Sequence, residues 1–141
     1  MKKIAVVYWS GTGNTEIMAN AVADGAEGTE NKVEVFKPSS FNASMIADYD
    51  AIAFGCPAMG AEALEESEFE PMFSACKAAV KDKKIGLFGS YGWGDGEWMR
   101  KWEANCRANG AVLVCDSVMC NETPDDDGIA KCRKLGEALC L

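Results

Sequence analysis

The chain has 141 residues, of which 48% are hydrophobic, and its formal net charge is −8. No apolar run approaches the roughly 20 residues of a membrane span, and an acidic surface disfavours nucleic acids and anionic membranes as partners. We therefore expect one domain, residues 1–141, that works in the cytoplasm as a monomer. The charge suits docking to a basic partner protein, although a need for solubility alone would also explain it.

Two features of the composition limit the kinds of catalytic and metal site that the chain can form. Histidine is absent, which excludes Ser–His and Cys–His catalysis. The seven cysteines include no Cys-x-x-Cys spacing, so neither a disulfide framework nor a zinc site is expected. We expect Cys115 and Cys120, in or beside a predicted strand, to be small buried apolar residues. So many free thiols indicate a reducing compartment.

The first half of the chain alternates between predicted strands and helices. Residues 4–9 are apolar and rich in β-branched side chains, typical of a central parallel strand. A helix follows from Thr15, and residues 32–37 alternate like a half-exposed strand. Residues 42–49 predict a short helix, and residues 51–55 predict a third, fully buried strand.

The second half continues the same alternation. Apolar spacing predicts a helix over residues 69–80, another from 98 to about 109, and a last one after an entry at 123–125. Residues 84–90 and 111–115 predict the fourth and fifth strands. Five strand–helix units predict a doubly wound α/β sandwich, in which ligands bind beyond the carboxyl ends of the strands.

The loop after the first strand, residues 10–15, has three hydroxyls, two glycines and no basic residue. Its amides and the following helix dipole favour an anion. The third glycine of G-x-G-x-x-G and the lysine of a P-loop are missing, so a dinucleotide or a triphosphate matches poorly. The loop therefore predicts a seat for a phosphate monoester, with an ordinary N-capped helix as the alternative.

The turn after the fourth strand, residues 90–98, sets Trp93 among three glycines. A tryptophan without neighbouring side chains fills a core poorly but offers a flat platform to a planar ligand. Trp98 and Trp102, at helical spacing, are expected to be packing residues.

The turn after the third strand, residues 55–66, places Met59 beside Gly60. Methionine offers a polarisable face to an aromatic ring, and glycine permits a positive φ. Taken alone, this turn is better explained as an ordinary loop, and it points to a ligand only together with the other two turns.

Together, the segments YWSGTGNTE, AMG, EESEFEP and LFGSYGWGDGEWM resemble a flavodoxin of the short-chain type found in anaerobic bacteria. The resemblance covers essentially the whole chain. It implies a flavodoxin-like three-layer sandwich with a five-stranded parallel sheet, in the order 2-1-3-4-5, and helices on both faces. It also implies non-covalently bound FMN as the cofactor.

The resemblance assigns a role to each turn. The first loop would bind the FMN phosphate, Met59 and Trp93 would cover the inner and outer faces of the isoalloxazine ring, and Glu62 would contact its pyrimidine edge. Ala61 departs from the Asp or Ser that relatives often carry. The expected FMN-binding residues are Ser10, Gly11, Thr12, Gly13, Asn14, Thr15, Ala58, Met59, Gly60, Ala61, Glu62, Ser90, Tyr91, Gly92, Trp93, Gly94 and Asp95.

The implied function is a low-potential one-electron carrier without a substrate of its own. It would shuttle between the FMN semiquinone and hydroquinone and replace ferredoxin between redox enzymes. The Gly60 carbonyl would rotate to accept a hydrogen bond from the protonated flavin N5. Carboxylates near the flavin with no base between them would lower the midpoint potential for the second electron, unless they point to solvent. The carboxylates expected at this end are Glu62, Glu65, Glu66, Asp95 and Glu97.

Two other functions share this architecture. A receiver domain needs acidic residues where this chain has Tyr8-Trp9-Ser10 and Gly55-Cys56-Pro57, so the sequence excludes it. A small FMN-dependent NAD(P)H:quinone-type reductase stays open as the alternative. Such an enzyme needs an open ring face and a pyridine-nucleotide site, for which 141 residues leave little room.

Overall fold

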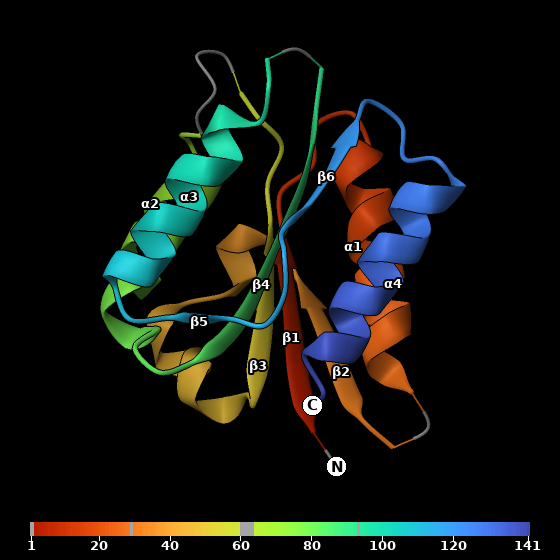
Figure 1. Cartoon of the computed structure of the whole chain (residues 1–141). Helices are drawn as coiled ribbons and strands as arrows, with labels where there is room; N and C mark the ends of the chain where they lie inside the picture. The colour runs from red at the N-terminus through yellow and green to blue at the C-terminus, as the bar shows by residue number, and fades with distance from the viewer. Residues whose placement is uncertain (1, 29, 60–63, 93) are drawn as a thin grey trace.

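The computed structural model describes residues 2–28, 30–59, 64–92 and 94–141. A parallel sheet lies between two layers of helices (Figure 1). The strand order β2-β1-β3-β4-β5 confirms the order that the sequence implied, and β6 also pairs with β4. The strands are β1 (Lys3–Tyr8), β2 (Lys32–Phe36), β3 (Ala51–Gly55), β4 (Lys84–Tyr91), β5 (Val112–Leu113) and β6 (Val118–Asn121).

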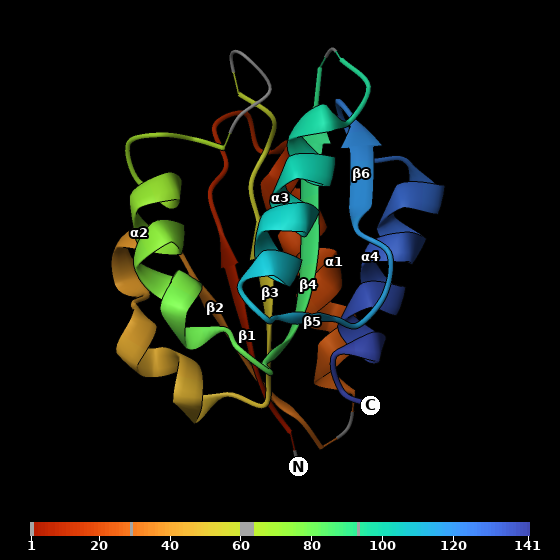
Figure 2. The ribbon, with the colours of Figure 1, turned by 60° about the vertical axis from the view of Figure 1, so that its left-hand side comes forward.

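Helices α1 and α4 cover one face of the sheet, and α2 and α3 cover the other (Figures 1 and 2). None of the helices among the described residues has the length and apolar character that crossing a bilayer requires. The α-helices are α1 (Asn14–Glu27), α2 (Phe69–Cys76), α3 (Glu97–Ala108) and α4 (Asp126–Ala138), and the 3-10 helices are η1 (Pro38–Ser40), η2 (Ala43–Asp48) and η3 (Lys77–Ala79).

An aromatic core lies under α2 and α3. Phe54 of β3 meets Phe73 of α2 edge to face at 5.2 Å, and Trp102 of α3 meets Phe69 at 5.4 Å. Trp98 and Trp102 are 2% and 3% exposed, which confirms them as packing residues. Burying side chains of this size contributes about 1.5–3 kcal/mol each, so this layer fixes α3 against the sheet.

Two glycines let α1 and α4 pack on the opposite face with their backbones nearly touching. A Cβ added at Gly25 would lie 2.0 Å from the Arg133 carbonyl oxygen, and one at Gly136 would lie 2.1 Å from that of Val22. Only glycine allows this approach, because any side chain would push the helices apart. The contact therefore fixes the position of α1, whose N-terminus borders the site described below.

The predicted fifth strand, residues 111–115, is wrong in its extent. β5 pairs with the start of β4, and β6 pairs with the end of β4, opposite Phe88 to Tyr91. Between them the chain leaves the ladder, and the Ser117 hydroxyl donates to Glu103 Oε2 at 2.7 Å. Cys115 in this segment is exposed, contrary to expectation, because the strand ends before it. Cys120 on β6 is buried, as expected, and all seven cysteines are free.

Candidate functional site

A cavity of about 520 Å³ opens at the carboxyl ends of the strands. Its volume is in the range of small-molecule and cofactor sites. Four loops contribute to its wall, those after β1, β3, β4 and β6. The residues that line it are Trp9, Gly11, Thr12, Asn14, Thr15, Pro57, Ala58, Met59, Ser90, Tyr91, Gly92, Glu122 and Thr123.

The loop after β1 is built to present amides. The Ser10 hydroxyl oxygen accepts the N–H groups of Gly13 at 3.1 Å and Glu16 at 3.3 Å. Gly13 has a φ of 98°, which turns the chain into α1. Within the described part of the chain, no acceptor is found for the amides of Gly11, Thr12, Asn14 and Thr15. Free amides at a helix N-terminus form an anion site, so this loop fits a phosphate monoester.

A pair of buried hydroxyls forms the floor of the cavity. The oxygens of Thr15 and Ser90 lie 2.8 Å apart, and the two residues are 1% and 5% exposed. The Ser90 carbonyl oxygen also accepts the Ala58 amide at 2.9 Å. The loops after β1, β3 and β4 are therefore linked to one another through hydrogen bonds.

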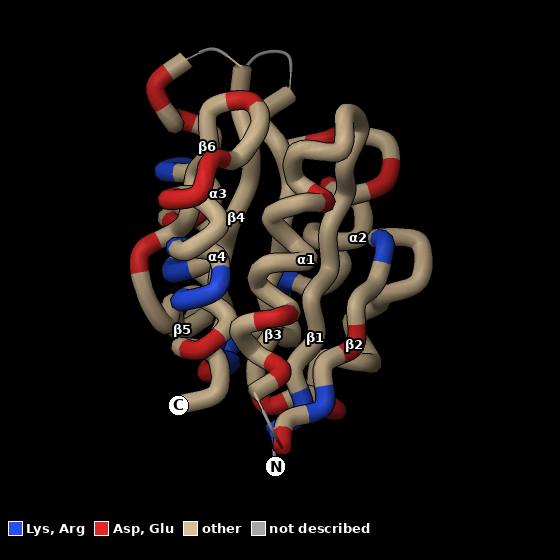
Figure 3. Tube along the Cα trace, turned by 90° about the vertical axis from the view of Figure 1, so that its right-hand side faces the viewer, with Lys and Arg blue, Asp and Glu red and all other residues tan. Residues whose placement is uncertain are grey.

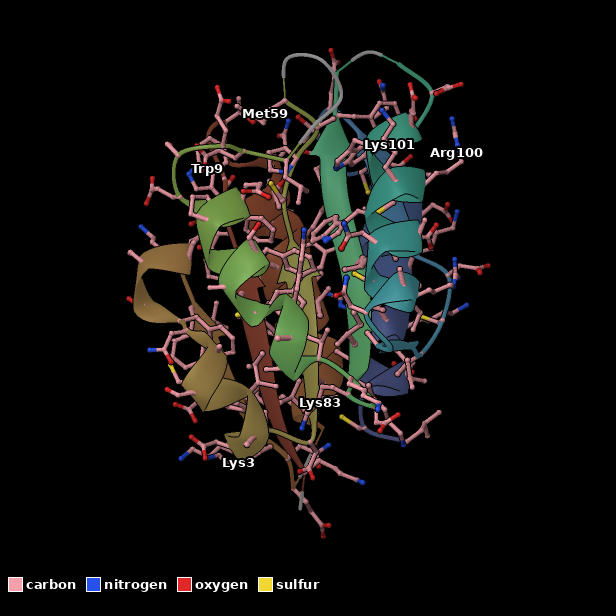
Figure 4. The ribbon with its side chains drawn as sticks, turned by 90° about the vertical axis from the view of Figure 1, so that its left-hand side faces the viewer. Lys3, Trp9, Met59, Lys83, Arg100 and Lys101 are labelled. Carbon is pink, nitrogen blue, oxygen red and sulfur yellow. The ribbon has the colours of Figure 1, made fainter. Side chains whose placement is uncertain are left out.

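The remaining walls offer apolar surface and open backbone. Met59 is 36% exposed and lies at the same end of the molecule as Trp9 (Figure 4). The Tyr91 ring packs against Trp98 at 5.6 Å. A Cβ at Gly92 would meet no atom within 4 Å, so the backbone there is open to a ligand. This wall suits a flat aromatic group.

The structure places most of the predicted site residues, but not all of them, in the cavity wall. Gly60, Ala61, Glu62 and Trp93 lie outside the described residues, so their flavin contacts and the Gly60 rotation stay predictions. Ser10 and Gly13 shape the phosphate loop but do not line the cavity. Gly94 and Asp95 also lie outside the lining set. The remaining predicted residues all line it.

The prediction of carboxylates without an intervening base is wrong at α3. Arg100 binds Asp95 at 3.0 Å, and Lys101 binds Glu97 at 3.3 Å. These partners follow five and four residues later, so the helix brings each base back to its carboxylate. Arg100 lowers the pKa of Asp95 through its hydrogen bond and its charge.

Glu65 is also not a free charge at the cavity. It is 5% exposed, and its carboxylate accepts the amides of Ser67, Glu68 and Phe69 at 2.8, 2.7 and 2.9 Å. The Ser67 hydroxyl donates to it as well. Burial alone would raise the pKa of Glu65, but these hydrogen bonds outweigh it and lower the pKa to about 2. Glu65 therefore caps the start of α2.

Sequence reasoning missed four wall residues, namely Trp9, Pro57, Glu122 and Thr123. Glu122 has a φ of 56° and donates its amide to the Tyr91 carbonyl oxygen at 2.7 Å. Thr123 donates its hydroxyl to Asn14 Oδ1 at 3.3 Å. Two of the four carry a usable sequence signal, since Trp9 directly precedes the phosphate loop and Pro57 lies within the turn of residues 55–66. Glu122 and Thr123 depend on β6, which sequence reasoning does not predict.

Comparisons with known proteins agree with this geometry. The family described as "Flavodoxin" matches residues 6–136. A flavodoxin of Megasphaera elsdenii is 44% identical over 135 residues, 96% of this chain and 96% of its own length. A flavodoxin of Clostridium beijerinckii is 44% identical over 121 residues, 86% of this chain and 88% of its own.

The fold comparison gives the same result. The solution structure of two-electron reduced Megasphaera elsdenii flavodoxin superposes with a TM-score of 0.89 at 44% identity, over 97% of this chain and 98% of that one. A flavodoxin structure from the domain Archaea gives a TM-score of 0.86 at 26% identity. Sequence, fold and the cavity at the strand ends lead to one conclusion. The chain belongs to the flavodoxin family.

Proposed function

We propose that this chain carries single electrons between redox proteins on a non-covalently bound FMN in the cavity at the strand ends. Flavodoxins are FMN-binding electron-transfer proteins, and family membership extends over nearly the whole chain. Bound FMN supplies a redox centre that takes up and releases electrons one at a time. The protein would have no substrate of its own and would act as one domain, residues 1–141.

The observation that carries this proposal is the phosphate loop. It offers free amides and hydroxyls to an anion and no basic side chain. Neutral donors suit a single terminal phosphate, and the loop has neither the third glycine of the dinucleotide-binding G-x-G-x-x-G nor the lysine of a triphosphate-binding P-loop. Next to this seat, Met59, Tyr91 and the open backbone at Gly92 form a wall for a flat ring. The cavity thus combines a phosphate-binding loop with an apolar wall for a flat ring, which are the two parts of a site that FMN requires.

Charge on the surface around the cavity suggests the kind of partner. Figure 3 shows Asp and Glu on several of the loops at this end of the sheet. Figure 4 shows Lys3 and Lys83 at the opposite end. Arg100 and Lys101, at the cavity end, are instead paired with Asp95 and Glu97. A partner with a basic docking surface would therefore be oriented with its redox centre towards the cavity. We propose that the protein meets such partners in the cytoplasm as a monomer.

The reductase alternative is not favoured. The 44% identical relatives are flavodoxins that match almost end to end, and none of the described residues in the cavity wall indicates a second nucleotide site. The test is to mix the FMN-loaded chain with NADPH and a quinone. We expect no steady NADPH oxidation until a flavoprotein reductase with a basic docking surface is added, and then a rate that falls with salt. Steady oxidation by the chain alone would establish the enzyme instead.

A further inference from the structure

Two buried thiols face each other between β6 and α4, on the side of the cavity away from α2 and α3. Cys120 of β6 is 6% exposed, and Cys132 of α4 is fully buried. A Cβ added at Gly128 would lie 2.6 Å from Cys120 Sγ and 3.9 Å from Cys120 Cβ. The Cys120 sulfur therefore occupies the space that the missing side chain of Gly128 leaves on α4.

Helix geometry brings Cys132 to the same place. Cys132 follows Gly128 by one helical turn, so both lie on the face of α4 that meets Cys120. Side chains in a helix lean towards its N-terminus, which points the Cys132 thiol back at Gly128 and the Cys120 sulfur. The two sulfurs are thus neighbours on two different elements.

The interaction between them also makes the two thiols unequal. The Cys132 thiol lowers the pKa of Cys120 more than burial raises it, with smaller effects from Asp125, Lys131 and Asp127. The Cys120 thiol raises the pKa of Cys132. Burial raises the pKa of Cys56, by contrast, to about 12. Cys120, which is 6% exposed while Cys132 is fully buried, is also the thiol of the pair that an oxidant reaches first, and a thiolate is the form that reacts with oxidants.

We propose that Cys120 and Cys132 are an oxidisable pair that forms an intramolecular disulfide when the protein meets hydrogen peroxide. The Cys120 thiolate attacks a peroxide oxygen, an S–O bond forms, the O–O bond breaks and hydroxide leaves. The Cys132 sulfur then attacks the Cys120 sulfur, the S–S bond forms, and the hydroxyl leaves as water with the Cys132 proton. Two thiols lose two electrons and two protons in total, and the peroxide becomes two waters.

The bond would act on a wall of the cavity. It closes a short loop, residues 121–131, which contains the cavity residues Glu122 and Thr123. A cross-link of this kind restricts the unfolded chain and so raises the melting temperature Tm. The neighbouring Cys115 is exposed and has no such partner among the described residues, so it serves as the matched control.

The test uses the full chain, purified in reductant, desalted under argon and treated with hydrogen peroxide. We expect a mass loss of 2 Da, a peptide that links Cys120 to Cys132, and a rise in Tm that a phosphine reductant reverses. C115S should behave like the parent chain. Failure of the parent to form this link, or a link through any other cysteine, would overturn the proposal.

Two variants test the order of the steps. In C132S, Cys120 should stop at the sulfenic acid, which dimedone traps, and in C120S Cys132 should stay reduced. C132A, which replaces the thiol with a small apolar group, repeats the first test if C132S does not fold. Trapping at Cys132 in C120S, at the rate seen for Cys120 in C132S, would contradict the assignment of Cys120 as the attacking thiol.

Discussion

The hydroxyl oxygens of Thr15 and Ser90 lie 2.8 Å apart at the floor of the cavity, although the two residues are 75 positions apart in the chain. Thr15 belongs to the phosphate loop, and Ser90 stands at the end of β4, where the opposite wall begins. Both are almost completely buried, so removing one hydroxyl leaves the other poorly solvated. This pair therefore fixes the phosphate loop relative to the wall that begins at the end of β4.

The first prediction removes one member of that pair. Thr15→Val keeps the shape of the side chain but leaves the Ser90 hydroxyl without its partner, which should lower the free energy of unfolding by about 1–3 kcal/mol. Urea unfolding of the FMN-free protein measures it. Thr12→Val, at an exposed position of the same loop, is the control and should stay within about 0.5 kcal/mol. Equal losses in the two variants would show that the buried pair contributes nothing.

The second prediction concerns the phosphate seat. The Thr12 hydroxyl lines the cavity and has no hydrogen-bond partner among the described residues, so it is free to donate to an anion. Thr12→Val should weaken FMN binding about 10-fold, because a hydrogen bond to a charged group is worth about 1.5 kcal/mol. Riboflavin lacks the phosphate, and its affinity should not change. Quenching of flavin fluorescence measures both constants, and equal weakening for the two ligands would place Thr12 elsewhere on the flavin.

The third prediction follows from the pKa of Glu65, which folding lowers from 4.5 to about 2. A depressed carboxyl pKa stabilises the protein above pH 4.5, and this stabilisation fades as the pH falls from 4.5 towards 2. Glu65→Gln should therefore cost on the order of 3 kcal/mol at pH 7 and progressively less at lower pH. Denaturant titrations between pH 7 and pH 3 measure the difference. Glu66→Gln, next in the chain and exposed, should show almost none, and a Glu65→Gln deficit that persists unchanged at pH 3 would refute the charged cap.

The fourth prediction compares how an unpaired and a paired carboxylate near the cavity affect the midpoint potential of the flavin. Glu122 lines the cavity, and no basic partner is found for it among the described residues. A carboxylate about 10 Å from the flavin costs roughly 0.8 kcal/mol at an effective dielectric of about 40, which is on the order of 35 mV for one electron. Glu122→Gln should therefore raise the midpoint potential for the second electron by about this amount. Redox titration at low salt measures it.

The matched control for Glu122 is the Asp95–Arg100 pair, whose charges are 3.0 Å apart and largely cancel. The double variant Asp95→Asn with Arg100→Gln removes both charges together and should leave the same potential almost unchanged. If the double variant shifts the potential as far as Glu122→Gln does, the electrostatic argument is wrong.

Much of this fold could be predicted because its strands are short, apolar and bounded by clear turns. Residues 4–8 and 51–55 are buried on both faces of a parallel sheet, and continuous apolar runs of this kind can be recognised in a single sequence. The strand order, by contrast, is predicted only by the family resemblance, because the sequence of one βα unit does not indicate which other strand its own strand pairs with.

The parts that could not be predicted depend on contacts between distant segments. Where the fifth strand divides, between β5 and β6, Ser117 bonds to Glu103 of α3, a residue 14 positions earlier in the chain. The role of Glu65 depends on three amides of the following turn, and a carboxylate in a run of acids gives no sign of that arrangement. Glu122 joins the cavity only because β6 pairs with the end of β4.

One measurement tests the central claim most directly, an anaerobic reductive titration of the FMN-loaded protein followed by its visible spectrum. A one-electron carrier should show a long-wavelength band of one-electron-reduced flavin that rises and falls before the flavin is fully bleached. Direct passage from oxidised to two-electron-reduced flavin, or a failure of the chain to retain FMN at all, would contradict the account.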